Sequence, residues 1–417
     1  MLKQNQKKKV PVPQTPQEIH VFIDIDDVQY FVGRLWSLFR NNRESASFEY
    51  DRSWLNNSYR FSLEPALELR GGTYHTDSGK SLFGSLGDSA PDRWGRILMR
   101  RFENERAKLN GENPRRLNEI DYLLLVNDQL RQGALRFKDS KGCEFLSCSK
   151  KSIPLLVDLP KLLAASDKIT NNAEISEELQ LLLAPGSSLG GARPKASVVD
   201  ENGNLCMAKF SRSNDEFSVV LWEAVALTLA KKSGIHVFDW RLENGALIVK
   251  RFDRIGTQRV PFLSAMSMLG ARDNDSMDHS YLEIADALTR YGAFPKRDMR
   301  ELWRRIVFSI FIMNTDDHLR NHAFLYNIGK GWELSPAYDL NPTFHRTGAL
   351  SLCISETDNM ASIELALSVS HRFQLTHMEA KNIVTEVYAG ICEWREIAKN
   401  IGIKNREIEQ MASVMSA

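Results

Sequence analysis

The segment NTDDHLRNHAF (residues 314–324) gathers two aspartates, two histidines and an arginine within eleven positions. The apolar run FSIFIM directly before it predicts a buried helix that ends near Asn314, so these polar side chains follow a helix end. Side chains of these types can bind a metal ion, transfer a proton or cap the helix. The segment alone leaves all three chemistries open.

Zinc binding is one of these chemistries. His318 and His322 are four positions apart, and side chains at that spacing share one face of a helix. A histidine pair beside acids is typical of zinc hydrolases. This segment lacks the glutamate of the H-E-x-x-H pattern, and a third ligand has to come from elsewhere, for instance His345. A zinc hydrolase is therefore one hypothesis.

Phosphoryl transfer is another. Asp316 and Asn321 are five positions apart, the spacing of the Asp and the Asn in the H-R-D-x-x-x-x-N loop of protein kinases. In kinases the Asp accepts the proton of the substrate hydroxyl, and the Asn holds Mg²⁺. A kinase also needs a metal-binding carboxylate further along the chain. The segment WELSPAYDLNP provides Asp339 directly after strand-like residues.

A Gly-rich turn lies upstream, in the segment GSSLGGARPKAS. Its backbone N–H groups at Ser187, Ser188, Gly190 and Gly191 are open to close approach by phosphate oxygens, and Lys195 stands just beyond. The turn matches neither the Walker A pattern nor GxGxxG. It therefore also fits a plain lead-in to a β-hairpin.

A lysine and a glutamate complete the set. Lys209 ends a predicted strand in CMAKF, which is similar to the V-A-I-K strand of protein kinases. A lysine on a buried strand is costly unless paired, and Glu223 on the next predicted helix is the natural partner. The alternatives are a Lys209 that extends to water, a solvated Glu223, and a polar helix cap around Asp316. They do not explain why all five features occur in the order found in kinases.

The 417 residues exceed what one hydrophobic core usually spans, so two or three packed units are expected. Alternating Val21, Ile23 and Ile25 predict a strand, and residues 28–32 its hairpin return. Long apolar-periodic helices begin at about Met299. We expect four segments: a disordered leader (1–19), an N-terminal subdomain (20–149), a unit with the Gly-rich loop, the Lys209 strand and a hinge (150–255), and a helical lobe (256–417).

Helices are predicted where apolar residues recur at helical spacing. For the first of them, Asp88 or Ser89 is the expected N-cap, and Pro91 suits the first turn. The predicted helices are 87–109, 119–126, 171–184, 215–235, 299–314, 378–401 and 405–415.

The composition is that of an ordinary globular protein, with 43% apolar residues, 26% charged residues and a formal net charge of +1. No strong field demands a nucleic-acid or membrane partner. The five cysteines are scattered and form no CxxC pair, so reduced thiols in a cytoplasm are expected. No run of eighteen apolar residues occurs, so no membrane span is predicted, and the Lys7–Lys9 run is expected to be solvated.

In combination these motifs resemble the HipA-type toxin kinases, the serine/threonine kinase half of a bacterial toxin–antitoxin pair. The resemblance extends from about His20 to about Ser413. The motifs that carry it are LGDSAPDRWGR (86–96), SSLGGARPKAS (187–197), VKRFDR (249–254), NTDDHLRNHAF (314–324) and SPAYDLNPT (335–343).

The resemblance implies an α+β, protein-kinase-like fold: a β-rich N-terminal lobe with an extra family-specific subdomain, and an all-α C-terminal lobe. It implies that Asp316 is the catalytic base and that Asn321 and Asp339 bind Mg²⁺. The residues it places at ATP are Gly190, Gly191, Ala192, Arg193, Pro194, Lys195, Lys209, Glu223, Lys250, Arg251, Phe252, His318, Leu319, Arg320, Asn321, Tyr338 and Asp339.

The resemblance also implies partners and self-modification. Such kinases phosphorylate a serine of their own Gly-rich loop, here Ser188 or the adjacent Ser187, and this is expected to eject the loop and switch the enzyme off. Their substrates are translation components of the aminoacyl-tRNA synthetase class. A HipB-type helix-turn-helix antitoxin neutralises them and links them to operator DNA. A second hypothesis is a catalytically silent module that acts as a co-repressor in that complex.

Overall fold

A computed structural model of the chain gives the positions of the elements and side chains. It describes residues 18–40, 43–148, 153–170, 182, 191, 193–212, 214–272, 279–344 and 348–415. Of the predicted helix at 171–184 only Leu182 is described, and of the predicted leader (1–19) only Glu18 and Ile19, the latter being the first residue of strand β1 (Ile19–Ile25).

The first sheet is antiparallel, with the strand order β4-β3-β2-β1-β5. Side chains of β1 alternate between buried and half-buried, as the period of two predicts. The two-residue turn Asp26–Asp27 joins β1 to β2 with positive φ at both positions, which matches the twist of a hairpin. The predicted hairpin is thus confirmed. The strands are β1 (Ile19–Ile25), β2 (Val28–Arg40), β3 (Arg43–Tyr50), β4 (Thr73–His75) and β5 (Leu135–Asp139).

Short and long helices pack beside this sheet: α1 (Arg52–Leu55), α2 (Gly84–Gly87), α3 (Arg93–Asn110), α4 (Glu119–Leu125) and the 3₁₀ turn η1 (Asp128–Leu130). The prediction that Asp88 or Ser89 caps the long helix was wrong. Asp92 is the N-cap of α3 and accepts a hydrogen bond from the Gly95 N–H, so Pro91 precedes the helix. Asp88 ends α2, and its carboxylate accepts hydrogen bonds from Ser264 instead.

The second sheet has the order β6-β7-β9-β8 and is antiparallel throughout. Helix α5 covers one side of it and shares a core with it and with α3. Helix α7 packs against β9 and also against the C-terminal helices. The elements are η2 (Leu156–Asp158), α5 (Leu159–Thr170), β6 (Lys195–Val199), β7 (Leu205–Phe210), α7 (Val219–Lys232), β8 (Trp240–Glu243) and β9 (Ala246–Lys250).

The C-terminal lobe is mainly helical, as predicted, but it also holds a three-stranded sheet in the order β12-β13-β14. The expectation of an all-α lobe is therefore corrected. The predicted helix at 378–401 is two helices, α12 and α13, with Cys392 and Glu393 between them. Helix α10 begins at Pro295, whose fixed φ suits a first turn, rather than at Met299.

The elements of this lobe are β10 (Arg254–Ile255), β11 (Gln258–Arg259), β12 (Phe262–Ser264), α8 (Ala265–Met268), α9 (Tyr281–Tyr291), α10 (Pro295–Ile312), η4 (Leu319–Asn321), β13 (Ala323–Asn327), β14 (Gly331–Leu334), α11 (Ile363–Ser368), η5 (Ser370–Phe373), α12 (His377–Ile391), α13 (Trp394–Ile401) and α14 (Asn405–Ala412).

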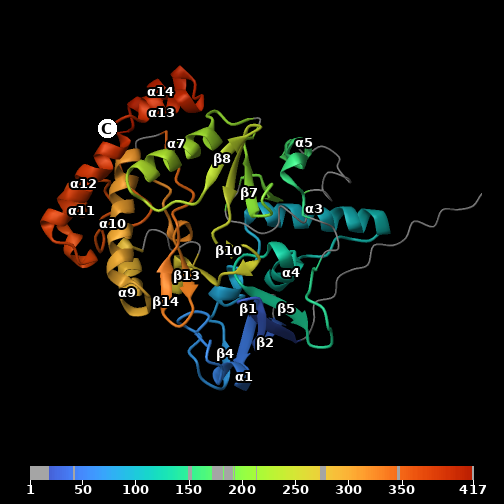
Figure 1. Cartoon of the computed structure of the whole chain (residues 1–417). Helices are drawn as coiled ribbons and strands as arrows, with labels where there is room; N and C mark the ends of the chain where they lie inside the picture. Colours follow the sequence, from blue (N-terminus) through green and yellow to red (C-terminus); the bar gives the residue numbers. More distant parts are fainter. Residues whose placement is uncertain are drawn as a thin grey trace, which may run out of the picture.

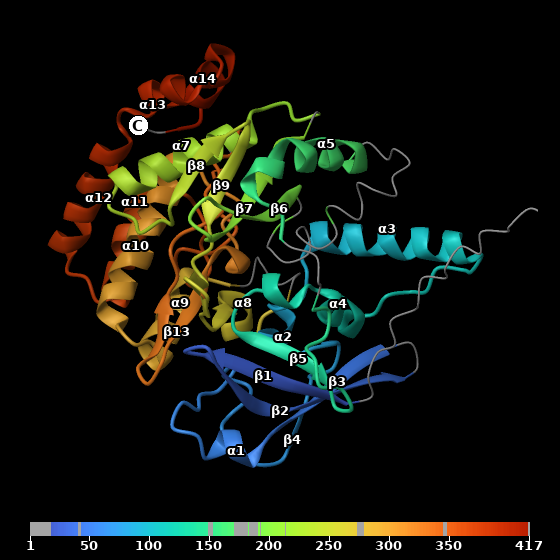
Figure 2. The ribbon, with the colours of Figure 1, turned by 45° about the vertical axis from the view of Figure 1, so that its right-hand side comes forward.

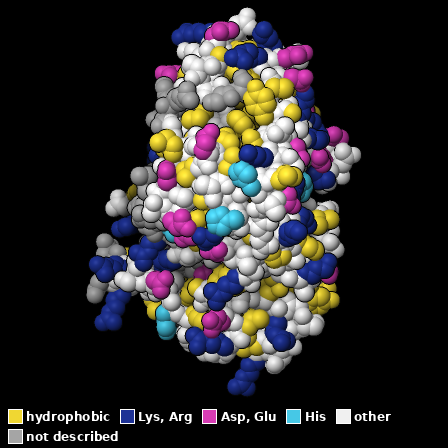
Figure 3. All heavy atoms as spheres, turned by 90° about the vertical axis from the view of Figure 1, so that its left-hand side faces the viewer, with side chains coloured by type: hydrophobic (Ala, Val, Ile, Leu, Met, Phe, Trp, Pro, Cys, Tyr) yellow, Lys and Arg dark blue, Asp and Glu magenta, His cyan; other side chains and the backbone are white. Residues whose placement is uncertain are grey.

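Figures 1 and 2 show how these parts are arranged. The first sheet (blue) lies at one end of the molecule and the second sheet (green to yellow) toward the other, while helices α9 to α14 (orange to red) cover one side. On that side positive and negative side chains are interspersed (Figure 3), in keeping with the small net charge. Among the described residues, no helix is both long enough and apolar enough to span a bilayer.

Candidate active site

A cleft of about 1870 Å³ runs between the first sheet's helices, the second sheet and the C-terminal lobe. It brings together side chains from segments far apart in the sequence. The predicted site residues that line it are Gly191, Arg193, Lys195, Lys209, Glu223, Lys250, Arg251, Phe252, Asp316, His318, Arg320, Asn321, Tyr338 and Asp339. Pro194 and Leu319 do not line it. Ser187, Ser188, Gly190 and Ala192 lie outside the described residues.

The loop after α10 holds Asp316 at the cleft. Helix α10 ends at Met313 in the left-handed conformation (φ 53°), which turns the chain out of the helix. Asp316 is accessible from the cleft, while its carboxyl group is partly enclosed by the surrounding protein. The amide Nδ2 of Asn321 donates to the backbone carbonyl of Asp316 at 3.0 Å. This bond fixes the two ends of the loop and leaves the amide oxygen of Asn321 for another partner.

The neighbouring Asp317 has a structural role. Its carboxylate is buried, accepts a hydrogen bond from the Tyr281 hydroxyl at 2.7 Å, and lies 3.0 Å from His322 Nε2. Burial alone would raise the pKa of Asp317, but the charge and hydrogen bond of His322 outweigh it and lower the pKa. The buried contacts of Asp317 with Tyr281 and His322 thus stabilise the loop that carries Asp316.

The structure does not place His318 and His322 together as zinc ligands. His318 lines the cleft, whereas His322 is buried against Asp317 and does not reach it. Within the described part of the chain, no three His, Cys, Asp or Glu side chains converge on a position that could hold a metal ion. The third ligand considered for zinc, His345, lies outside that part.

Lys209 joins the second sheet to the C-terminal lobe. Its ammonium Nζ lies 2.5 Å from Glu223 Oε1 on α7 and 3.1 Å from Asp339 Oδ1. The predicted strand lysine and helix glutamate thus pair. Burial alone would lower the pKa of Lys209, but the two carboxylates raise it, so the ammonium stays charged. Burial raises the pKa of Glu223 despite Lys209.

Asp339 has an unusual backbone conformation, and the pKa of its carboxyl is lowered. Its φ is +58°, a left-handed conformation that few non-glycine residues adopt and that is frequent at functional sites. Burial would raise its pKa, but the charges of Lys209 and Lys195 outweigh burial and lower it. Its carboxylate is therefore an anion at neutral pH.

Two buried polar atoms at the cleft have no hydrogen-bond partner among the described residues: His318 Nδ1 and Asn341 Oδ1. Asn341 also donates to Asp339 Oδ1 at 3.4 Å. An unpaired buried donor or acceptor is costly, so these two atoms are candidate contacts for a ligand or a water. The oxygens of Asp339, Asn321 and Asn341 form the kind of hard donor set that suits Mg²⁺.

The environment of Asp316 suits a general base. Burial raises the pKa of its carboxyl, the negative charges of Asp339 and Asp317 raise it further, and His318 partly opposes them. A base of raised pKa holds a proton more strongly after transfer.

The described part of the Gly-rich loop leads into β6. Lys195 is buried, and its Nζ lies 3.1 Å from the carboxylate of Asp92, the N-cap of α3. A second bond joins the same elements, because the Trp94 indole donates to the Lys195 carbonyl at 3.0 Å. Arg193 pairs with Asp215 at 2.9 Å on the other side of the loop. The N-terminal subdomain thus supplies the partner of a predicted nucleotide-binding lysine.

The hinge, residues 250–252, is only partly free for a nucleotide. The Lys250 and Arg251 N–H groups already donate to Asp239 and Leu205 carbonyls, at 2.9 and 3.1 Å. The Phe252 ring lines the cleft and packs 5.5 Å from the Tyr338 ring, centroid to centroid. Phe252 is therefore the hinge residue that presents an apolar surface to the cleft.

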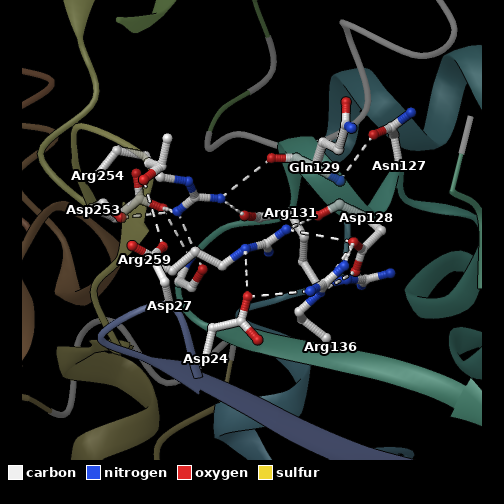
Figure 4. A network of polar contacts seen from close by, with 12 residues as sticks. Asp24, Asp27, Asn127, Asp128, Gln129, Arg131, Arg136, Asp253, Arg254 and Arg259 are labelled. Atoms are coloured by element: carbon white, nitrogen blue, oxygen red, sulfur yellow. Dashed lines mark hydrogen bonds and ion pairs between the residues drawn. The ribbon is translucent and has the colours of Figure 1, made fainter. Parts of the chain in front are cut away.

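The guanidinium of Arg251, a residue of the cleft lining, is buried and takes part in a network of ion pairs and hydrogen bonds. It pairs with Asp253 at 2.5 Å and donates to the Leu130 carbonyl at 2.6 Å. Figure 4 shows how Asp253 and Arg254 continue into a network with Arg131 and Asp128 of the N-terminal subdomain. These bonds anchor the hinge to the N-terminal subdomain, and the expected contact of the hinge backbone with adenine stays a prediction.

Sequence reasoning missed Asp92 and Asn341. Asp92 lies 103 positions before Lys195, so no local spacing points to their contact. Both stand in motifs noted in the sequence, LGDSAPDRWGR and SPAYDLNPT. A polar residue that has no assigned role inside such a specific motif is the signal that could have identified them.

Tyr338 is held in place by another site residue, since its hydroxyl donates to the Arg320 carbonyl at 2.7 Å.

Known structures share this fold. HipA of Shewanella oneidensis MR-1, solved in a toxin–antitoxin complex with HipB and operator DNA, superposes with a TM-score of 0.66 and 16% identity, over 95% of this chain and 94% of its own. The expected α+β, kinase-like two-lobe fold is thereby confirmed, with the small sheet of the C-terminal lobe as the one correction.

Related sequences cover parts of the chain. Y4dM of Sinorhizobium fredii, provisionally named a kinase, is 31% identical over 158 residues, 37% of this chain and 36% of the relative. A Haemophilus influenzae protein with the same provisional name is 26% identical over 187 residues, 37% of this chain and 52% of that protein. The chain thus spans between a third and about half of these relatives.

Two family models match the chain along most of its length. The HipA N-terminal domain matches residues 28–137, and the HipA-like C-terminal domain matches residues 187–416, more than half of the chain. The second match contains every candidate site residue described above except those of the N-terminal subdomain. The chain therefore belongs to the HipA family.

Proposed function

We propose that this chain is a serine/threonine kinase toxin that transfers the γ-phosphoryl group of ATP to a serine hydroxyl. The observation that carries the proposal is the contact of Lys209 with both Glu223 and Asp339 at the cleft that also holds Asp316. Paired lysine, metal-binding aspartate and catalytic aspartate are the parts from which kinases build the site of phosphoryl transfer.

In this reaction the serine oxygen forms a bond to the γ-phosphorus while the bond from that phosphorus to the β,γ-bridging oxygen breaks, and ADP leaves. Asp316 orients the hydroxyl and accepts its proton. Lys209 holds the phosphates, and Glu223 fixes the lysine. Asp339, Asn321 and the unpaired oxygen of Asn341 would hold a Mg²⁺ ion, which would supply neutralisation of phosphate charge.

The apolar part of the cleft suits a purine. Met207, Val249, Phe252 and Phe238 line it beside the hinge. Aromatic and aliphatic side chains give a base shape-matched, water-poor contact, and the remaining hinge carbonyl and N–H groups provide polar contacts. His318 also lines the cleft, and its Nδ1 has no partner among the described residues, so we infer that it contacts the phosphates.

Partners follow from family membership. HipA of Shewanella oneidensis was solved with HipB and operator DNA, and we infer a HipB-type helix-turn-helix antitoxin for this chain, with operator DNA bound through that antitoxin. We also infer a substrate serine in a protein of the aminoacyl-tRNA synthetase class, and self-phosphorylation at Ser188 or Ser187.

The test is the rate of ADP formation from Mg-ATP by the purified full-length chain. Asp316→Ala and Asp339→Ala are expected to abolish turnover, while Asp286→Ala, an exposed aspartate on α9, leaves it unchanged. Circular dichroism checks that each variant is folded. If the wild type and both site variants form ADP at the same low rate, the chain is a silent co-repressor module and the proposal is wrong.

A further inference from the structure

Helix α7 carries Glu223 but lacks the usual means of capping its own start. Its N-cap, Ser218, makes no capping bond with its side chain, and the first turn holds no acidic residue. The first N–H groups of a helix need acceptors, and negative charge is favourable there because of the helix dipole. A helix end of this kind requires a partner from elsewhere in the fold.

That partner is Glu407 on α14, 189 positions further along the chain. Its carboxylate accepts hydrogen bonds from the Ser218 N–H at 2.9 Å, the Ser218 hydroxyl at 3.0 Å and the Trp222 indole Nε1 at 3.0 Å. Glu407 is 6% exposed, and these donors are neutral. A buried carboxylate is costly unless it is hydrogen-bonded, so the burial of Glu407 depends on these three donors.

Trp222 links Glu407 to the segment that follows Asp339. The indole is 1% exposed and lies directly before Glu223. The Phe344 ring meets it edge-on, with centroids 5.6 Å apart. Phe344 also stacks on Phe217, just before α7, with centroids 3.5 Å apart and planes within 10°. Phe344 lies five positions after Asp339 in the chain.

The C-terminal helices also pack against α7. Trp394 of α13 packs against Trp222 with centroids 6.2 Å apart, and α12 and α13 both contact α7. Figures 1 and 2 show α13 and α14 beside α7 in both views. The start of α7 is thus held by α14 on one side and by the loop after Asp339 on the other.

We propose that Glu407 is a positioning residue for phosphoryl transfer: through Ser218 and Trp222 it holds α7 where Glu223 keeps Lys209 against Asp339. The inference rests on the proposed kinase function. It assigns the C-terminal helix α14 to the catalytic machinery, although α14 contributes no residue to the cleft. Kinases depend on the placement of the helix that carries this glutamate.

The test compares Glu407→Gln with Glu409→Gln in the full-length chain. Both glutamates are on α14, but Glu409 is exposed. Glutamine keeps the shape of residue 407, yet its amide nitrogen cannot accept a hydrogen bond. We expect kcat for phosphoryl transfer to fall about tenfold in Glu407→Gln. Amide hydrogen exchange in 214–225 and 335–344 is expected to speed up, and Glu409→Gln to match the wild type in both.

A second variant covers the case in which Glu407→Gln does not fold. Trp222→Phe removes the indole donor but keeps an aromatic ring against Phe344, and it is expected to cause the same changes. The inference is overturned if kcat stays at the wild-type value, even where exchange is faster, because Glu407 then only stabilises the fold. If the wild type itself transfers no phosphoryl group, the proposed function fails, and unchanged exchange in 335–344 separately overturns the positioning role.

Discussion

The ammonium of Lys209 lies 3.1 Å from the carboxylate of Asp339, although 130 positions separate the two residues. Lys209 is the penultimate residue of strand β7 in the second sheet, and Asp339 follows strand β14 of the C-terminal lobe. The ion pair therefore joins the two sides of the cleft at the place where nucleotide phosphates are proposed to bind.

Replacing this lysine should damage both activity and stability. In Lys209→Met, Glu223 is left buried without its cation, and breaking a buried pair in this way costs about 3 kcal/mol of unfolding free energy. We expect kcat/KM for ATP to fall at least about a hundredfold. Lys231→Met, an exposed lysine on α7, is the control, measured by denaturant unfolding and ADP formation. Wild-type kcat/KM in Lys209→Met would contradict the assignment.

The N-terminal subdomain should affect nucleotide binding through Asp92. In Asp92→Asn the side chain can still cap α3, since asparagine is a good N-cap, but Lys195 loses its ion pair. We expect KM for ATP to rise several-fold while the melting temperature changes little. Asp158→Asn, which affects only a surface pair with Lys161, serves for comparison. An unchanged KM would show that Asp92 has no role beyond the helix cap.

These sites differ in how far the sequence predicted them. Asp316, Asn321 and Asp339 follow local spacings that the chemistry itself requires, and Lys209 with Glu223 follows from the cost of a buried lysine. The pair of Asp92 and Lys195 depends on how α3 packs on the second sheet, which no local pattern encodes.

The fold was predicted with similar limits. The β1–β2 hairpin, α4, α7 and α10 follow from residue periodicity and turns. The break between α12 and α13 and the three-stranded sheet of the C-terminal lobe depend on tertiary packing, because their sequences are compatible with helix or with short strands. The orientation of the Arg251 side chain toward Asp253 is likewise decided by the buried network of the hinge.

The pH dependence of activity should reflect the raised pKa of Asp316. The base must be ionised to accept a proton, so kcat/KM falls as the pH drops through that pKa. Because burial raises the pKa, this acid limb should lie above the range of an ordinary aspartate, which is about 4. A pH–rate profile of kcat/KM measures it. Full activity maintained down to about pH 4 would show that no such base is needed.

A second pH effect should appear in stability. Glu64 is buried where it accepts the Ser85 N–H, and burial raises its pKa to about 7. Between about pH 4.5 and 7 the folded chain keeps a proton that the unfolded chain releases. The folded state therefore loses stability as the pH rises through this window, by about 3 kcal/mol in total.

Glu64→Gln removes this titration, so its stability should decline less than that of the wild type as the pH rises from about 4.5 to 7. Denaturant unfolding at a series of pH values provides the comparison, and Glu68→Gln, whose side chain is 73% exposed, is the matched control. Parallel curves for the wild type and Glu64→Gln would mean that Glu64 is ionised throughout.

The central claim is that Asp316 directs transfer of a phosphoryl group from ATP to a serine. Mass spectrometry of the full-length chain after incubation with Mg-ATP tests it most directly, with Asp316→Asn beside the wild type. The account predicts phosphoserine at Ser188 or Ser187 in the wild type and none in the folded Asp316→Asn variant. Equal phosphorylation of both proteins, or none in either, would contradict it.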